Sequence, residues 1–252
     1  MQLYDKNWLD AHQDTLSDWK KDAFQQFSSM LIDTDHPYPC VPGMQGFLKN
    51  HLRFQFVGDP REEKTFHELA STLAHYGDIS RDTGKYASLV VFFETSDELL
   101  NESQEAFQDM FWTILNEVHA LDEKEWPENI PTDPHDTAWE YSFCGEPYFV
   151  FCATPYHQVR KSRHFPYFML AFQPRWVFAE INDSTSFGRK MKKAIRSRLK
   201  AYDKIAPHPD LKWYGKSDNH EWKQYFLSDD DNESKGTCPF TYMKKKLNKL
   251  LP

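Results

Sequence analysis

The densest group of side chains able to do chemistry lies between Thr154 and Tyr167. It holds two histidines and three cations, in the order His157, Arg160, Lys161, Arg163, His164. A neutral imidazole can bind iron, basic side chains can neutralise the propionates of haem, and aromatic side chains can cover the macrocycle. An exposed basic loop between two strands has the same composition. The segment therefore indicates either a haem site or a solvated loop.

A second unusual segment is the proline-rich loop His36–Cys40, in which Pro37 and Pro39 prevent a helix. The prolines hold the backbone around Cys40, so its sulfur either faces a pocket or is an ordinary small core group. The chain has four cysteines and no C-x-x-C pair, and nothing in this pattern suggests an oxidising compartment.

Several classes of protein are excluded by what the sequence lacks. It has no Walker A sequence, no G-x-G-x-x-G after a strand, no G-x-S-x-G and no H-E-x-x-H. The net charge of -8 argues against nucleic acid and anionic membrane as partners. Apolar stretches such as Leu89–Phe93 are too short to span a bilayer, and the first ten residues do not resemble a signal peptide. We expect a cytoplasmic protein.

Two runs of charged residues lie in the C-terminal third of the chain, one basic and one acidic. Seven cations between Arg189 and Lys200 resemble a nucleic-acid helix, but apolar residues at helical spacing favour a helix packed on a sheet with a solvated outer face. The acidic run Asp229–Asn232 lacks the spacing of a calcium loop and reads as a solvated turn.

Hydrophobic periodicity predicts α+β architecture, with a largely antiparallel central sheet flanked by helices. No repeat or long linker divides residues 1–252, so we expect a single domain. Helices are predicted over 16–31, 42–50, 60–76, 99–119 and 187–202, with a short helix at the C-terminus. Strands are predicted over 52–57, 86–94, 139–143, 148–153, 168–172 and 176–181. The helix at 99–119 should lie on the sheet, with Phe111 in the core.

Sequence blocks along nearly the whole chain resemble the YqcI/YcgG family. The blocks are His36–Gly43 (HPYPCVPG), Leu52–Val57 (LRFQFV) with Asp59-Pro60, Phe143–Phe149 (FCGEPYF), Arg160–Pro166 with Phe172–Pro174 (FQP), and Glu221–Tyr225 (EWKQY) with Cys238–Phe240 (CPF).

This resemblance implies a b-type haem protein, as in family members that N-hydroxylate guanidine groups of arginine or arginine-derived amino acids. It implies His157 as the iron ligand, Arg160 and Arg163 as partners of the propionates, and Glu146 as the carboxylate that holds the cationic group of the substrate. A hairpin-capping role for Glu146 is the alternative. Where oxygenase-like members have a His-Pro pair, this chain has Thr154-Pro155, so His164 or His36 could replace His157 as ligand.

Three functions follow from this reading. The first is a haem-dependent N-oxygenase (a monooxygenase) acting on a small, arginine-like substrate with an external electron donor. The others are a non-catalytic haem or small-ligand protein and a haem-free protein that keeps only the fold. In the first two, we expect His36–Cys40, Arg53, Cys144–Glu146 and His157–His164 to converge on one aromatic-lined pocket.

Overall fold

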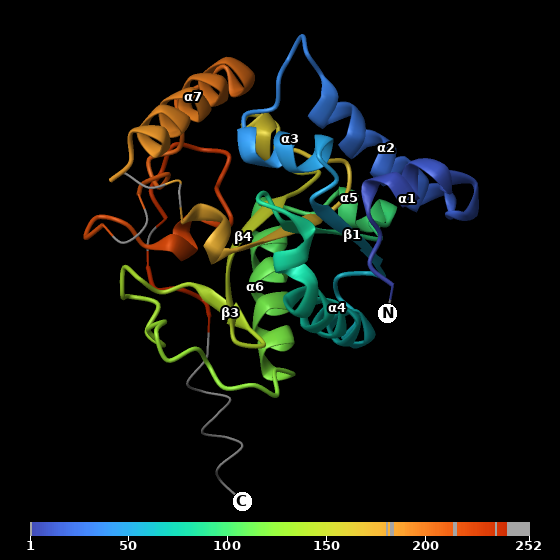
Figure 1. Ribbon diagram of the computed structural model, residues 1–252, viewed down its shortest axis with the longest axis horizontal. Coiled ribbons are helices and arrows are strands. Elements are labelled where there is room, and N and C mark those ends of the chain that lie inside the picture. The colour runs from blue at the N-terminus through green and yellow to red at the C-terminus, as the bar shows by residue number, and fades with distance from the viewer. Residues whose placement is uncertain (1, 180, 182–183, 214–215, 235, 241–252) are drawn as a thin grey trace, which may run out of the picture.

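The computed structural model describes residues 2–179, 181, 184–213, 216–234 and 236–240. Its centre is a five-stranded sheet with strand order β1-β2-β5-β4-β3 (Figure 1). The strands are β1 (Leu52–Val57), β2 (Ser88–Phe93), β3 (Tyr141–Phe143), β4 (Glu146–Ala153) and β5 (Met169–Pro174). β1 and β2 are parallel, and every other neighbouring pair is antiparallel. The predicted α+β class with a largely antiparallel sheet is confirmed.

One face of the sheet is covered by helices α4 (Glu63–Thr83) and α6 (Gln104–Ala120), and the short helix α5 (Asp97–Leu100) precedes α6. β2 is a continuous apolar run because it is buried on both faces. Phe111 of α6 is fully buried, as predicted. The predicted helix at 99–119 is interrupted, because the Ser103 hydroxyl accepts the N–H of Ala106 and begins α6 as a new helix.

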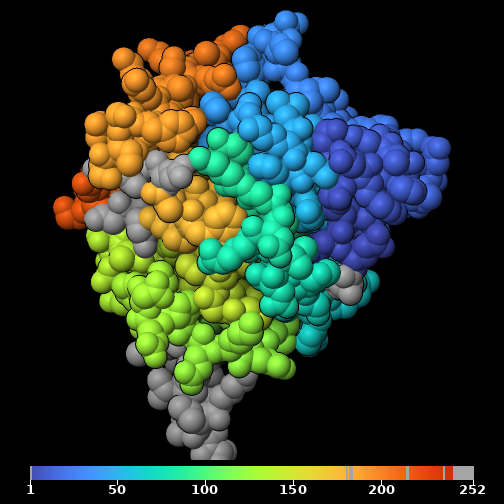
Figure 2. Space-filling model, viewed as in Figure 1, coloured from blue at the N-terminus to red at the C-terminus, as the bar shows by residue number. Residues whose placement is uncertain are grey.

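The opposite face is covered in two parts. Helices α1 (Lys6–Ala11), α2 (Asp18–Ile32) and α3 (Val41–Leu48) bury an aromatic cluster over β1 and β2. Helix α7 (Ser186–Asp203) stands over the β4 side, and its orange atoms adjoin the blue N-terminal segment in the space-filling view (Figures 1 and 2). Tyr202 of α7 contacts Tyr38 edge to face at 5.7 Å.

The short connections contain four 3-10 helices. They are η1 (Gln13–Thr15), η2 (Lys161–Arg163), η3 (Arg175–Phe178) and η4 (Glu221–Gln224). The β3–β4 hairpin turns at Cys144 and Gly145, which both have positive φ, as a two-residue hairpin turn requires. No helix among the described residues is long and apolar enough to cross a membrane.

One predicted strand is wrong. Residues 176–178 form part of η3 instead, because β5 already has β2 and β4 on its two sides and Pro174 ends its ladder. The predicted C-terminal helix falls outside the described residues.

Candidate functional site

A cavity of about 310 Å³ lies between the outer face of β4 and helix α7. Phe149 and Phe151 project into it because they alternate along β4 with the core residues Tyr148, Val150 and Cys152. Ile195 and Leu199 line it from α7. No apolar residue of α7 is fully buried, so the apolar stripe of this helix faces the cavity rather than the sheet.

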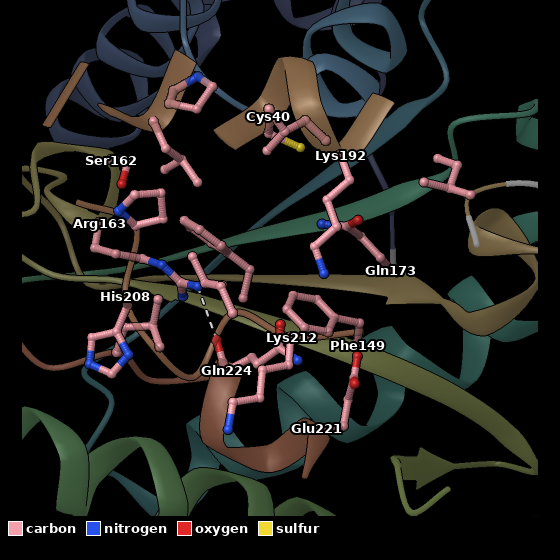
Figure 3. Close-up of a pocket in the computed structure, with 18 of the residues that line it drawn as sticks. Cys40, Phe149, Ser162, Arg163, Gln173, Lys192, His208, Lys212, Glu221 and Gln224 are labelled. Carbon is pink, nitrogen blue, oxygen red and sulfur yellow. Dashed lines mark hydrogen bonds between the residues drawn. The ribbon is translucent and has the colours of Figure 1, made fainter. Parts of the chain in front are cut away.

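The structure brings together part of the predicted site. Tyr38, Pro39 and Cys40 line the cavity, as do Arg160, Ser162 and Arg163 (Figure 3). The predicted site residues Arg53, Cys144, Glu146, His157 and His164 are not among the lining residues of this cavity. The proline-rich loop and the basic loop thus share one site, and the hairpin turn does not contribute to it.

Arg163 is a buried cation on the cavity wall. Its Nη1 donates to the carbonyls of Cys152 and Tyr225, and its Nη2 donates to that of Gln224, at 2.9–3.2 Å. The guanidinium carbon lies 4.2 Å from the centre of the Phe151 ring. Burial lowers the pKa of Arg163 to about 10, so it stays charged at neutral pH. Three of its five N–H groups are used, and two remain for an anion.

Arg160 is also buried, but its donors are used within the protein. Its Nε donates to Ser228 O, its Nη1 to Ala206 O, and its Nη2 to Asp230 O and to the Asp231 carboxylate. This side chain holds the 206–231 segment in place. Its predicted role as a propionate partner would require breaking those bonds.

His157 is buried with both ring nitrogens occupied. Nδ1 is 2.7 Å from Thr154 Oγ1, and Nε2 is 2.8 Å from the carbonyl of Leu227. The carbonyl can only accept, so Nε2 carries the proton and Nδ1 accepts from the hydroxyl. Burial lowers the pKa of His157 and keeps it neutral. No lone pair remains for iron, which argues against His157 as the ligand.

The other predicted ligands lie elsewhere. His164 Nδ1 bonds the carbonyl of His157, and His36 is an exposed side chain beside Asp33. Cys40 caps α3 by accepting the N–H of Gly43, and burial raises the pKa of its thiol. A neutral thiol is a poor metal ligand.

The last two predicted residues have local partners. Arg53 donates to the carbonyls of Asn50 and Leu52. Glu146 begins β4, and Arg81 Nη2 lies 3.4 Å from its carboxylate.

Several lining residues were not anticipated from the sequence, namely Gln173, Lys192, His208, Lys212, Glu221 and Gln224. His208 has a fully buried side chain, and its Nδ1 accepts the N–H of Asp210 at 3.2 Å. Its Nε2 has only a long 3.4 Å contact with Ser228 Oγ. Only its position between Pro207 and Pro209 could have drawn attention to it.

The floor of the cavity is the 3-10 helix η4, in which residues three apart share a face. Glu221 and Gln224 face the cavity, while Trp222 and Tyr225 pack in the core. The Tyr225 hydroxyl donates to Tyr148 O and accepts from Tyr141 N, which fixes η4 against the hairpin.

The chain matches the model of the YqcI/YcgG family over residues 27–241, and it belongs to this family. The class defined by fold and sequence is therefore that of the YqcI/YcgG proteins.

The chain is also similar to three individual proteins. The chain is 53% identical over 249 residues to YcgG and to YqcI of Bacillus subtilis, covering 98% of each chain. It is 35% identical over 235 residues to DcsA of Streptomyces lavendulae, named as an N(omega)-hydroxy-L-arginine synthase, covering 91% of this chain and 86% of DcsA. No solved structure matches the chain.

The cavity contains the residue types that haem requires. His208 supplies a neutral imidazole, because burial lowers its pKa, and Phe149 and Phe151 supply flat apolar faces. Arg163, Lys192 and Lys212 supply positive charge for propionates. A second pocket of about 60 Å³ shares Tyr38, Cys40, Phe151 and Gln173 with the cavity and extends its apolar wall. His208 Nδ1 accepts the N–H of Asp210, so Nε2 carries the proton here too. Its contacts of 3.2 and 3.4 Å are longer than the 2.7 and 2.8 Å contacts of His157, so His208 fits as the imidazole of a haem site once these two contacts are released.

Proposed function

We propose that this protein is a haem-dependent monooxygenase that N-hydroxylates a guanidine or amine group of an arginine-like small molecule. The observation that carries the proposal is that three distant family blocks, at Tyr38–Cys40, Arg160–Arg163 and Glu221–Gln224, line one cavity. Similarity to DcsA supports the reaction class. The cavity volume of about 310 Å³ is at the lower end of small-molecule sites, so haem and substrate together would require α7 to move away from β4.

The reaction has a simple balance. One atom of dioxygen enters an N–H bond of the substrate, and the other leaves as water with two electrons and two protons. No amino-acid side chain performs this chemistry, so the haem supplies the iron that activates dioxygen. The electrons come from an external donor.

The chain's own residues hold and enclose the reactants in this proposal. His208 would hold the iron through Nε2 once its proton has moved to Nδ1 and the Asp210 N–H bond is broken, and Arg163, Lys192 and Lys212 would bind the propionates. Phe149 and Phe151 on one side, and Ile195 and Leu199 on the other, exclude water from the space between them. Cys40 contributes apolar volume as a neutral thiol.

The test is titration of the purified full chain with hemin, followed by absorption spectroscopy in the Soret region. We expect a specific Soret band in the wild type and in His157→Gln, and its loss in His208→Ala. Circular dichroism checks that both variants fold. Loss of the band in His157→Gln with retention in His208→Ala would restore His157 as the ligand.

The reduced, hemin-loaded protein is then given L-arginine. Consumption of dioxygen and a product heavier by one oxygen atom are expected. A Soret band without turnover of any guanidine or amine would favour a non-catalytic haem protein. Absence of a specific band in the wild type would favour a haem-free role.

A further inference from the structure

Glu221 is a buried carboxylate that faces the cavity without a counter-ion. Its side chain is 5% exposed, and it lies on the cavity floor below Phe149 (Figure 3). Asn219 Nδ2 donates to its Oε2 at 3.0 Å. Among the described residues, Oε1 has no hydrogen-bond donor, and no Lys, Arg or His nitrogen lies within 4.0 Å of the carboxylate.

The orientation of the Glu221 side chain is fixed by its hydrogen bond from Asn219. Asn219 is 1% exposed, and its Oδ1 accepts from Gln224 Nε2 at 2.8 Å. The amide of Asn219 therefore points its nitrogen at Glu221 Oε2. This leaves Oε1 directed at the cavity, in a side chain that cannot rotate freely.

Among the described residues, Glu221 has no direct ion pair. Glu140 is fully buried next to Glu221, and Arg175 Nη1 donates to Glu140 Oε1 at 2.7 Å. Glu140 Oε2 is buried without a partner among the described residues. Burial raises the pKa of Glu140 to about 8, so at neutral pH Arg175 does not face two full negative charges. The charges of Arg175 and Lys192 act on Glu221 from more than 4.0 Å away, and buried charges are normally paired directly. A cation in the cavity would supply that direct partner.

We propose that Glu221 binds the positively charged nitrogen group of the substrate and so selects a cationic guanidinium or ammonium over a neutral analogue. A guanidinium fits because it presents parallel N–H donors to a carboxylate. This inference rests on the proposed function for the identity of the site, and it replaces Glu146 as the anchor. Glu146 lies outside the cavity and already has Arg81 beside it.

Isothermal titration calorimetry with L-arginine and L-citrulline tests the inference on the full chain loaded with hemin. Citrulline replaces the guanidinium by a neutral urea of nearly the same shape. We expect the wild type to bind arginine at least tenfold more tightly than citrulline. Glu221→Gln, which keeps the shape and removes the charge, should lose at least tenfold in arginine affinity and the preference between the two ligands.

Two further variants complete the design. Glu105→Gln removes an exposed carboxylate of α6 and should bind like the wild type. Glu146→Gln tests the sequence-based anchor and should also keep the preference for arginine. Glu221→Asp keeps the charge and shortens the side chain, so it should keep the preference with weaker binding, and it replaces Glu221→Gln if that variant does not fold.

The outcomes separate this inference from the proposed function. If the wild type prefers arginine and Glu221→Gln keeps that preference, or if only Glu146→Gln loses it, the role of Glu221 is refuted and the function stands. If the wild type binds neither arginine nor another cationic amino acid, the proposed substrate class is refuted. Unchanged Soret spectra in all variants show that any loss concerns the ligand and not the haem.

Discussion

At the scale of single residues, the burial of His157 makes the stability of the folded protein depend on pH. Its pKa is about 4 in the folded protein, mainly because of burial, against about 6.5 in an unfolded chain. The unfolded state therefore binds more protons between these values. The free energy of unfolding should fall as the pH drops from 6.5 towards 4, by about 3 kcal/mol from this residue.

Urea denaturation of the wild type and His157→Gln at pH 7.5 and pH 4.5 measures this contribution. Gln can still donate to Leu227 O but does not titrate. The stability advantage of the wild type should therefore shrink by about 2–3 kcal/mol at the lower pH. His36→Gln serves as the control for replacing an exposed histidine. An equal difference between wild type and His157→Gln at both pH values would contradict the assignment.

The sequence shows which residue types form the site, but it does not show which way their side chains point. Arg160 and Arg163 are three residues apart in the chain. The N–H donors of Arg160 bind acceptors within residues 206–231, whereas Arg163 faces the cavity. The partners of Arg160 lie between 46 and 71 positions away in the chain, so no local pattern shows them. Glu221 was missed for the same reason, because only the packing of Trp222 and Tyr225 turns it towards the cavity.

At the scale of elements, Asp229 holds the loop that leads into η2. Its carboxylate accepts the backbone N–H groups of Gln158, Val159 and Arg160 at 2.8–3.0 Å. These bonds lower the pKa of Asp229 despite its partial burial. The acidic run Asp229–Asn232, predicted to be a solvated turn, therefore contains one residue, Asp229, that holds the backbone of the neighbouring loop in place.

Asp229→Asn should weaken the attachment of this loop. Hydrogen bonds to a charged group contribute about 1.5–3 kcal/mol each, and they weaken when the charge is lost. Hydrogen–deuterium exchange of the amides at 158–160 should accelerate at least tenfold. Asp231→Asn is the matched control, because Asp231 is exposed and accepts from the Arg160 side chain but from none of these three backbone amides. Similar exchange in both variants would show that Asp229 does not hold this loop in place.

Elements with strong local signals were predicted well. The apolar run of β2, the Gly145 turn of the hairpin and the periodicity of α7 each specify one local structure. The failures occur where tertiary context decides. Residues 176–178 are a run of apolar, strand-favouring types, but no strand neighbour is available beside β5. Ser103 divides a periodic helix with a single side-chain cap.

At the scale of the whole molecule, we propose that the chain folds as one cooperative unit. β1 and β2 join β3–β5 in one sheet, and both faces of that sheet are buried. Phe111→Ala on the α6 face should lower the free energy of unfolding by about 3–5 kcal/mol. Exchange protection of β1 amides and of α2 on the opposite face should fall by the same amount. Loss of protection on the α6 face alone would show two separable units.

The cavity beneath α7 also makes the ligand part of the folding equilibrium. The apolar stripe of α7 has the cavity opposite it, so a molecule that fills this space completes a hydrophobic core that the polypeptide alone leaves open. A ligand present at a hundred times its dissociation constant adds about 2.7 kcal/mol to the stability of the state that binds it. The lifetime of the folded protein in a cell would then follow the supply of that ligand, and a shortage of the ligand would appear first as loss of protein.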